Sequence, residues 1–159
     1  MAFQAFFIFA TLVFGVFADT PYSRCESGND FNRVPITHFQ MNGCVWSLCE
    51  VISGSTLNLG LNFTAVEDIG LNTQAIVSEA LIIVGRPFPV YQTNLCDLTP
   101  CPILAGTNVV IFAPGFVQSS TPPGMYTVRV TIVDNAKTVI CLEFTIVIKM
   151  IQCSSNSEL

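Results

Sequence analysis

Apolar and polar residues alternate with a period of two along much of the chain. Residues 56–65, 125–133 and 138–150 follow the pattern most clearly, and shorter candidate strands cover residues 34–41, 75–84 and 108–113. In the first stretch, Leu57, Leu59, Leu61 and Phe63 occupy every second position. Because successive side chains of a strand point to opposite faces of a sheet, the pattern predicts strands with one buried face.

Proline, glycine and asparagine separate these stretches. Pro114-Gly115 and Pro122-Pro123-Gly124 predict loops, and Asp134-Asn135 predicts a hairpin turn between two strong strands. Pro87-Phe88-Pro89 fixes two φ angles and lacks two backbone donors, so we expect it to leave regular pairing and to present Phe88 on a stiff, extended loop. Many short strands separated by turns predict an all-β sandwich of two antiparallel sheets.

Residues 1–18 form an apolar segment without a charged side chain, ending in Val16-Phe17-Ala18. This pattern predicts a cleaved signal peptide and a mature chain that begins at Asp19. A membrane anchor is the alternative, but the apolar run is short for a bilayer span of about 20 residues. We therefore expect a secreted protein with one domain at residues 19–150 and a loose polar tail at residues 151–159.

The charge pattern excludes several functions. The chain has six Lys and Arg residues, which do not cluster, and a formal net charge of −5, so a nucleic acid is not an expected partner. Charged residues make up 11% of the chain, about half the usual share, which indicates apolar surface turned inward. With one histidine and no pairing of a nucleophile with a base, the sequence predicts no enzyme, no cofactor and no metal site.

Seven cysteines have a spacing that suits disulfides. Two Cys-x4-Cys pairs stand at Cys44 and Cys49 and at Cys96 and Cys101, and the others are Cys25, Cys141 and Cys153. Zinc would need four close ligands, often including histidine, whereas an oxidising compartment favours disulfides. Each Cys-x4-Cys pair would close a local loop, and Cys25 could pair with either Cys141 or Cys153. The odd cysteine, if it is Cys153, could link two copies into a homodimer.

An ordered set of motifs resembles a known family. The set is Cys25, Gly43-Cys44-x4-Cys49, Gly85-x-Pro87-Phe88-Pro89, Cys96-x4-Cys101-Pro102-Ile103-Leu104 and Ile140-Cys141-Leu142-Glu143-Phe144. Over residues 24–149 the chain resembles the ML-domain lipid-recognition family, including the Niemann–Pick type C cholesterol-transfer proteins and their arthropod relatives. The resemblance implies an immunoglobulin-like β-sandwich, a lipid pocket between its sheets and the disulfides Cys25–Cys141, Cys44–Cys49 and Cys96–Cys101.

The resemblance also suggests which residues line the pocket. It places Phe88 at the mouth and the segment from Phe112 to Val117, with Phe116, on the opposite wall. The strand residues Leu61, Phe63, Tyr126, Val128, Phe144 and Ile146 are further candidates. For these strand residues, ordinary core packing is the alternative and the more common role of an inward side chain.

The function expected from these features is a secreted carrier of a sterol, fatty acid or semiochemical, with transient membrane or receptor contact for cargo transfer and delivery outside the cell or to the lysosome. The alternatives are innate-immune recognition of bacterial lipid and a non-carrier sandwich used for adhesion. Asn62-Phe63-Thr64 is an N-glycosylation sequon in a predicted secreted chain, so we expect a glycan on Asn62.

Overall fold

The computed structural model describes residues 19–25, 34–42, 44–45, 48–81 and 88–150, with backbone only for residues 45, 48, 77–81 and 88–89. Within these ranges the chain forms ten strands and one turn of 3-10 helix. The elements are β1 (Ser23–Arg24), β2 (Ile36–Met41), β3 (Cys44–Val45), β4 (Leu48–Ile52), β5 (Thr56–Thr64), β6 (Gln74–Leu81), β7 (Phe88–Asn94), η2 (Leu95–Asp97), β8 (Asn108–Phe116), β9 (Gly124–Asp134) and β10 (Lys137–Lys149). The predicted signal peptide and the tail with Cys153 lie outside the described residues.

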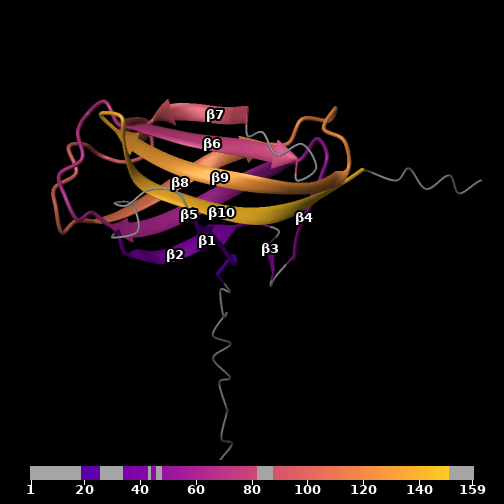
Figure 1. Ribbon diagram of the computed structural model, residues 1–159, viewed down its shortest axis with the longest axis horizontal. Helices are drawn as coiled ribbons and strands as arrows, with labels where there is room; N and C mark the ends of the chain where they lie inside the picture. The colour runs from indigo at the N-terminus through magenta and orange to yellow at the C-terminus, as the bar shows by residue number, and fades with distance from the viewer. Residues whose placement is uncertain (1–18, 26–33, 43, 46–47, 82–87, 151–159) are drawn as a thin grey trace, which may run out of the picture.

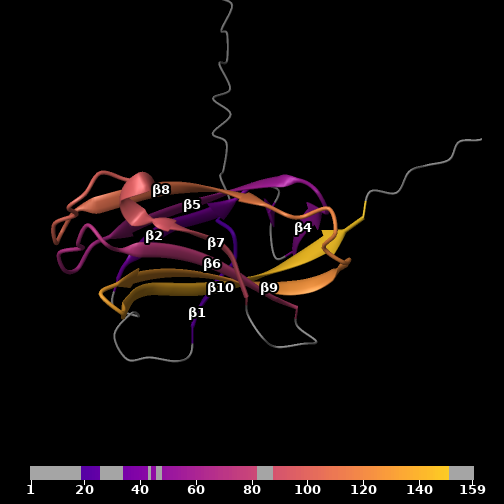
Figure 2. The same cartoon turned by 90° about the horizontal axis from the view of Figure 1, so that it is seen from above.

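The described strands form two layers (Figures 1 and 2). The large sheet has the order β3-β4-β10-β9-β6-β7, with β1 also paired to β10, and the small sheet has the order β2-β5-β8. The predicted all-β, immunoglobulin-like sandwich is therefore confirmed, and its strands are antiparallel with one exception. β4 runs parallel to β10, with Cys49 opposite Ile146.

The alternating pattern of the sequence accounts for the core between the layers. In β9 and in the second half of β10 buried side chains alternate with more exposed ones, and the two strands pair so that Val128 lies opposite Phe144 and Tyr126 opposite Ile146. In β5 the buried residues Leu59, Leu61 and Phe63 face the large sheet. Figure 2 shows the two layers edge on. A two-residue repeat on both inner faces is what a sandwich requires.

Two segments predicted as loops are strands. β7 begins at Phe88, whose backbone pairs with Glu79, and β8 continues through Pro114-Gly115, which pair with Asn58 and Leu57. Each is the outermost described strand of its sheet. One side of an edge strand has no partner, so a proline can belong to it without breaking the ladder. The expected loop character of both segments was therefore wrong.

Three disulfides join described cysteines. They are Cys25–Cys141, Cys44–Cys49 and Cys96–Cys101, the pairs that the family resemblance implied. The first links residues 116 positions apart and ties β1 to β10. In the chain-entropy model such a long loop contributes about 5 kcal/mol, whereas each five-residue separation contributes about 2 kcal/mol. The first bridge therefore constrains the unfolded chain most.

The predicted hairpin joins β9 to β10. Lys137 pairs with Asp134 across a two-residue turn, in which Asn135 and Ala136 have φ values of 46° and 65°. Two successive positive φ values are typical of a type I′ turn, whose twist matches that of the flanking strands. No described helix is long and apolar enough to cross a membrane.

Candidate functional site: a cavity between the two sheets

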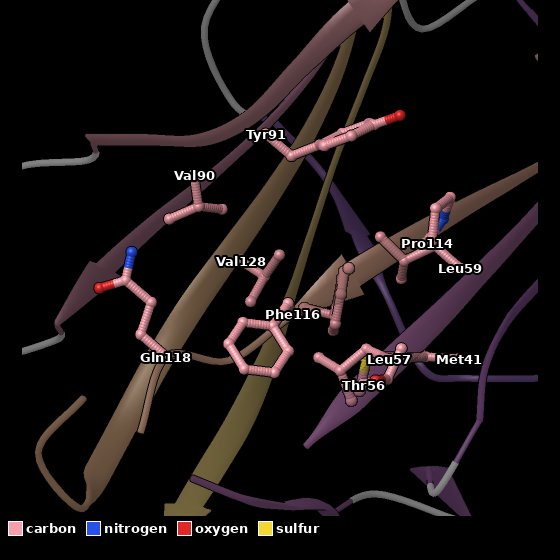
Figure 3. Close-up of a pocket in the computed structure, with 12 residues that line it drawn as sticks. Met41, Thr56, Leu57, Leu59, Val90, Tyr91, Pro114, Phe116, Gln118 and Val128 are labelled. Atoms are coloured by element: carbon pink, nitrogen blue, oxygen red, sulfur yellow. The ribbon is translucent and has the colours of Figure 1, made fainter. Parts of the chain in front are cut away.

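A cavity of about 330 Å³ lies between the sheets, at the end where β5 begins and β8 ends. Both layers contribute to its wall, as Figure 3 shows. The lining residues are Met41, Thr56, Leu57, Leu59, Val90, Tyr91, Pro114, Gly115, Phe116, Gln118, Val128 and Phe144. Most of these side chains are apolar, and the volume is in the range of small-molecule sites in proteins.

The cavity opens between the edge strands β7 and β8. Phe116 from β8 is 62% exposed and Val90 from β7 is 44% exposed, although both line the cavity. Gln118, just beyond β8, is also exposed and contributes an amide to the rim. In Figure 3, Val90 and Gln118 lie on one side of the Phe116 ring and Leu57 on the other. These residues define the mouth.

Backbone and side-chain hydrogen bonds fix the loop beyond β8. The Gly54 N–H donates to the Val117 carbonyl at 2.9 Å, and the buried Ser53 hydroxyl lies 3.0 to 3.3 Å from the carbonyls of Gln118, Ser119 and Thr121. Gly54 has a φ of +84°, a left-handed conformation that glycine adopts without steric cost. The turn between β4 and β5 therefore holds the segment that carries the rim.

The polar groups of the described lining are uncharged. They are Thr56, Tyr91 and Gln118, whereas Arg129–Glu143 and Lys149–Glu50 form ion pairs on the outer face of the large sheet. Such a wall can bury an apolar ligand and offer hydrogen bonds near the mouth. It holds no nucleophile, base or metal ligand set among the described residues.

A second void, of about 20 Å³, lies further along the space between the sheets. Leu59 and Tyr91 border both spaces. On the far side the void is lined by residues such as Phe39, Leu61 and Ile132, which are buried. Leu59 and Tyr91 therefore form the inner boundary of the cavity.

The structure brings some of the predicted site residues to the cavity and places others elsewhere. Phe116, Val128 and Phe144 line it, and Leu61 borders the small void. Four further candidates are buried without lining either space, namely the strand residues Phe63, Tyr126 and Ile146 and the residue just beyond β8, Val117. Tyr126 also donates its hydroxyl to the Pro122 carbonyl at 2.9 Å. A ligand role for any of these residues stays a prediction.

The two remaining aromatic candidates differ in what the structure describes. Phe112 is 60% exposed and lies on the outer face of the small sheet, because the inward positions of β8 are Val109, Ile111 and Ala113. Its ring covers Gly60, the residue opposite it on β5. Phe88 is described by its backbone only, at the first position of β7.

Sequence reasoning missed Tyr91, Val90, Gln118 and Met41 as lining residues, and it did not select Leu57 and Leu59. The alternation in β5 could have added Leu57 and Leu59, because they share a face with Leu61. The pairing register between β6 and β7 breaks at Val90, which lies between Pro89, paired with Ser78, and Tyr91, paired with Val77, and both Val90 and Tyr91 line the cavity. No periodic pattern signals such a bulge.

The predicted glycosylation site lies away from the cavity. Asn62 is half-buried on the outer face of the small sheet, since its neighbours Leu61 and Phe63 face inward. The sequon hydroxyl of Thr64 donates to Asn108 Oδ1 at 2.8 Å. A glycan on Asn62 would therefore extend from the face opposite the ligand space, and its presence stays a prediction.

Known proteins resemble both the sequence and the fold. The chain is 29% identical over 97 residues to the mite group 2 allergen Gly d 2.01 of Glycyphagus domesticus, covering 58% of this chain and 73% of the allergen. The crystal structure of a Niemann–Pick type C2 protein from the Japanese carpenter ant matches with a TM-score of 0.69 and 18% identity, over 81% of this chain and 99% of the other.

Two further observations concern the fold and the family. Chicken MD-1, crystallised with lipid IVa, matches with a TM-score of 0.51 and 20% identity, over 78% of this chain and 85% of MD-1. The model of the ML domain matches residues 19–148, which is most of the chain and includes every lining residue of the cavity. The chain therefore belongs to the ML-domain family.

Proposed function

We propose that this protein is a secreted carrier that binds one small lipid, such as a sterol or a fatty acid, between its two sheets. The observation that carries the proposal is the apolar cavity of about 330 Å³, which opens between β7 and β8. An empty space of this size would destabilise a tightly packed sandwich, because the side chains that line a void lose dispersion contacts. Membership of the ML-domain family supports the same function.

The energetics suit reversible capture. Burying about 400 Å² of ligand surface favours binding by roughly 10 kcal/mol before costs are counted. Lost translational and rotational freedom opposes this by several kcal/mol. Affinity near the micromolar range follows without any ion pair. The exposed rim at Phe116 and Val90 would be the part of the protein that meets a membrane or a receptor during transfer.

Secretion is supported by the disulfides, since they persist in oxidising compartments. The predicted signal peptide at residues 1–18 agrees with this. A disulfide through Cys153 would make a covalent homodimer, which non-reducing electrophoresis of the wild type beside Cys153→Ser would reveal.

Native mass spectrometry of the secreted protein tests the carrier function. We expect a bound mass of a few hundred daltons that organic extraction removes, and a delipidated protein that then takes up a fluorescent fatty acid or sterol. A protein that holds nothing and takes up neither probe would contradict the proposal and favour the adhesion alternative.

Recognition of bacterial lipid is a second candidate, because the structural neighbour MD-1 was crystallised with lipid IVa. Phosphate capture normally requires cations at the rim, and the described lining contains none. A salt titration of lipopolysaccharide binding separates the two functions. Phosphate recognition should weaken strongly as salt rises, whereas apolar capture should not.

A further inference from the structure

Tyr91 separates two spaces between the sheets. Of the described residues that line the cavity of about 330 Å³, only Tyr91 and Leu59 also line the void of about 20 Å³. Tyr91 comes from β7 in the large sheet, and Leu59 comes from β5 in the small sheet. The two side chains therefore close the inner end of the cavity from opposite layers.

The same boundary crosses the neighbouring strands. Along β9, Val128 lines the cavity and Val130 lines the void. Along β8, Gly115 lines the cavity and Ala113 lines the void. Residues two positions apart in a strand share a face of the sheet. The inner faces thus continue from the cavity to the void, and the two boundary side chains interrupt the space between them.

Two polar residues of the lining lie at the mouth. Gln118 belongs to the exposed rim, and Thr56 pairs with Phe116, the rim residue at the end of β8. In Figure 3, Thr56 and Tyr91 lie at opposite ends of the labelled side chains, and the Tyr91 hydroxyl points away from the Phe116 ring. A lipid keeps its polar head near water and hydrogen-bonding groups and buries its tail. In this cavity the tail would run inward to the Tyr91 ring.

Tyr91 is the less firmly held of the two boundary residues. Leu59 is 8% exposed, and its strand pairs with β2 on one side and β8 on the other. Tyr91 is half-buried in β7, for which the structure describes a partner on one side only, and it follows the register break at Val90. Beyond it the void is lined by apolar residues such as Leu61 and Ile132. A smaller side chain at this position would join the void to the cavity without altering a central strand.

We propose that the bound lipid lies with its head at the mouth and its tail against Tyr91, and that the Tyr91 ring sets the longest tail that the cavity accepts. The inference rests on the proposed carrier function and narrows its ligand class to lipids with a linear tail of limited length. Each methylene group that enters the cavity strengthens binding about fourfold, whereas one that stays outside does not. Affinity therefore rises with chain length until the tail reaches the ring, and then levels off.

Saturated fatty acids from octanoate to stearate test the assignment, with affinities for delipidated protein measured by isothermal titration calorimetry at pH 7.5. In the wild type, affinity should rise up to a limiting chain length and level off beyond it. In Tyr91→Ala, the next longer acid, with two more methylene groups, should bind at least about tenfold more tightly than the acid of the wild-type limit. The shortest acids should bind as in the wild type, which shows that the mouth is intact. Tyr91→Phe keeps the ring and should keep the limit.

Two further variants and a control guard against an unspecific effect of Tyr91→Ala. Val130→Phe in the Tyr91→Ala background places a ring in the joined space and should return the limit to shorter chains. Leu59→Ala opens the same boundary from the small sheet and should lengthen the limit as well. Phe112→Ala is the matched control, because it removes an aromatic ring from the outer face of the small sheet, away from the cavity. Its limit should stay at the wild-type value.

Several results would overturn the role of the Tyr91 ring while leaving the carrier function in place. One is an unchanged limit in both Tyr91→Ala and Leu59→Ala, and another is a wild-type affinity that keeps rising through stearate. A shift in Tyr91→Phe as large as that in Tyr91→Ala would assign the effect to the hydroxyl instead. A protein that binds a fluorescent sterol but none of the fatty acids would also refute the inference. If it binds neither class of lipid, the carrier function itself fails, and the inference with it.

Discussion

The two halves of the space between the sheets differ in how they are filled. In the half near the Asp134–Lys137 turn, Phe63, Ile69, Leu95 and Ile132 are buried with 0 to 1% of their surface exposed, and the void there measures about 20 Å³. In the half near Phe116 the same two sheets enclose about 330 Å³. The comparison shows that an alternating pattern creates two apolar faces without deciding whether they touch.

Loops account for the difference. In the packed half, Ile69 and Ile103 exchange backbone hydrogen bonds at 2.8 and 3.2 Å, and Leu95 begins the short helix η2. These loop residues add a third set of side chains between the sheets. In the open half, the described residues at the corresponding positions are the rim residues Gly115 and Gln118, and β7 and β8 have no further described strand beside them. Among the residues that the structure describes, no loop side chain fills the open half.

Truncation in the packed half should have the largest effect on stability. Phe63→Ala removes a ring that is 1% exposed and leaves a hole that the surrounding sheets cannot close. We expect a loss of about 3–5 kcal/mol in the free energy of unfolding, measured by urea denaturation. A loss below about 1 kcal/mol would mean that this half is as loosely filled as the other.

The same valine-to-phenylalanine substitution in each half of the space between the sheets sharpens the comparison. Val128 lines the cavity and Val130, two residues further along the same face of β9, lines the small void. Val130→Phe should cost about 1–3 kcal/mol of stability by overpacking. Val128→Phe should leave stability within about 0.5 kcal/mol, because the ring can enter open space, and should weaken lipid binding at least about tenfold by occupying it. Equal destabilisation by both substitutions would show that the cavity is not available to side chains.

Two exposed phenylalanines on β8 test where the mouth lies. Phe116 and Phe112 are 62% and 60% exposed, but only Phe116 lines the cavity. Phe116→Ala should weaken lipid binding about three- to tenfold through lost apolar contact, whereas Phe112→Ala should leave affinity unchanged. Both should change stability little, as surface substitutions usually do. Displacement of a fluorescent lipid measures the two affinities. An equal fall in affinity in both variants would indicate that the mouth lies on the outer face of the small sheet.

Much of the fold could be predicted, because strands with one buried face alternate visibly. The stretches at residues 56–65, 125–133 and 138–150 became β5, β9 and β10 with shifts of at most one residue at each end. β7 and the end of β8 could not be predicted in this way. A proline interrupts a central strand but is tolerated in an edge strand, which is where Pro89 and Pro114 lie. Position within a sheet is a property of tertiary structure that local sequence does not encode.

The site was less predictable than the fold. Alternation within β5 assigned Leu61 and Phe63 to the inner face but could not tell which half of the space each would occupy. Phe112 and Phe116 occupy equivalent positions of the two-residue repeat along β8, but only Phe116, at the end of the strand, reaches the opening. The register of β6 against β9, which helps to form the wall, depends on pairing between residues about 50 positions apart.

A final substitution concerns only the packed half and should leave the cavity untouched. Ala136 has a φ of 65°. In this left-handed conformation the Cβ atom of an L-residue lies too close to the neighbouring backbone, whereas glycine has no Cβ and is not strained. Ala136→Gly should therefore raise the free energy of unfolding by about 0.5–1 kcal/mol, since relief of strain exceeds the extra entropy of the unfolded chain. Urea denaturation gives the stability, and lipid displacement should give the wild-type affinity. A change in affinity would show that the turn between β9 and β10 is coupled to the mouth, and the two halves would then have to be treated as one unit.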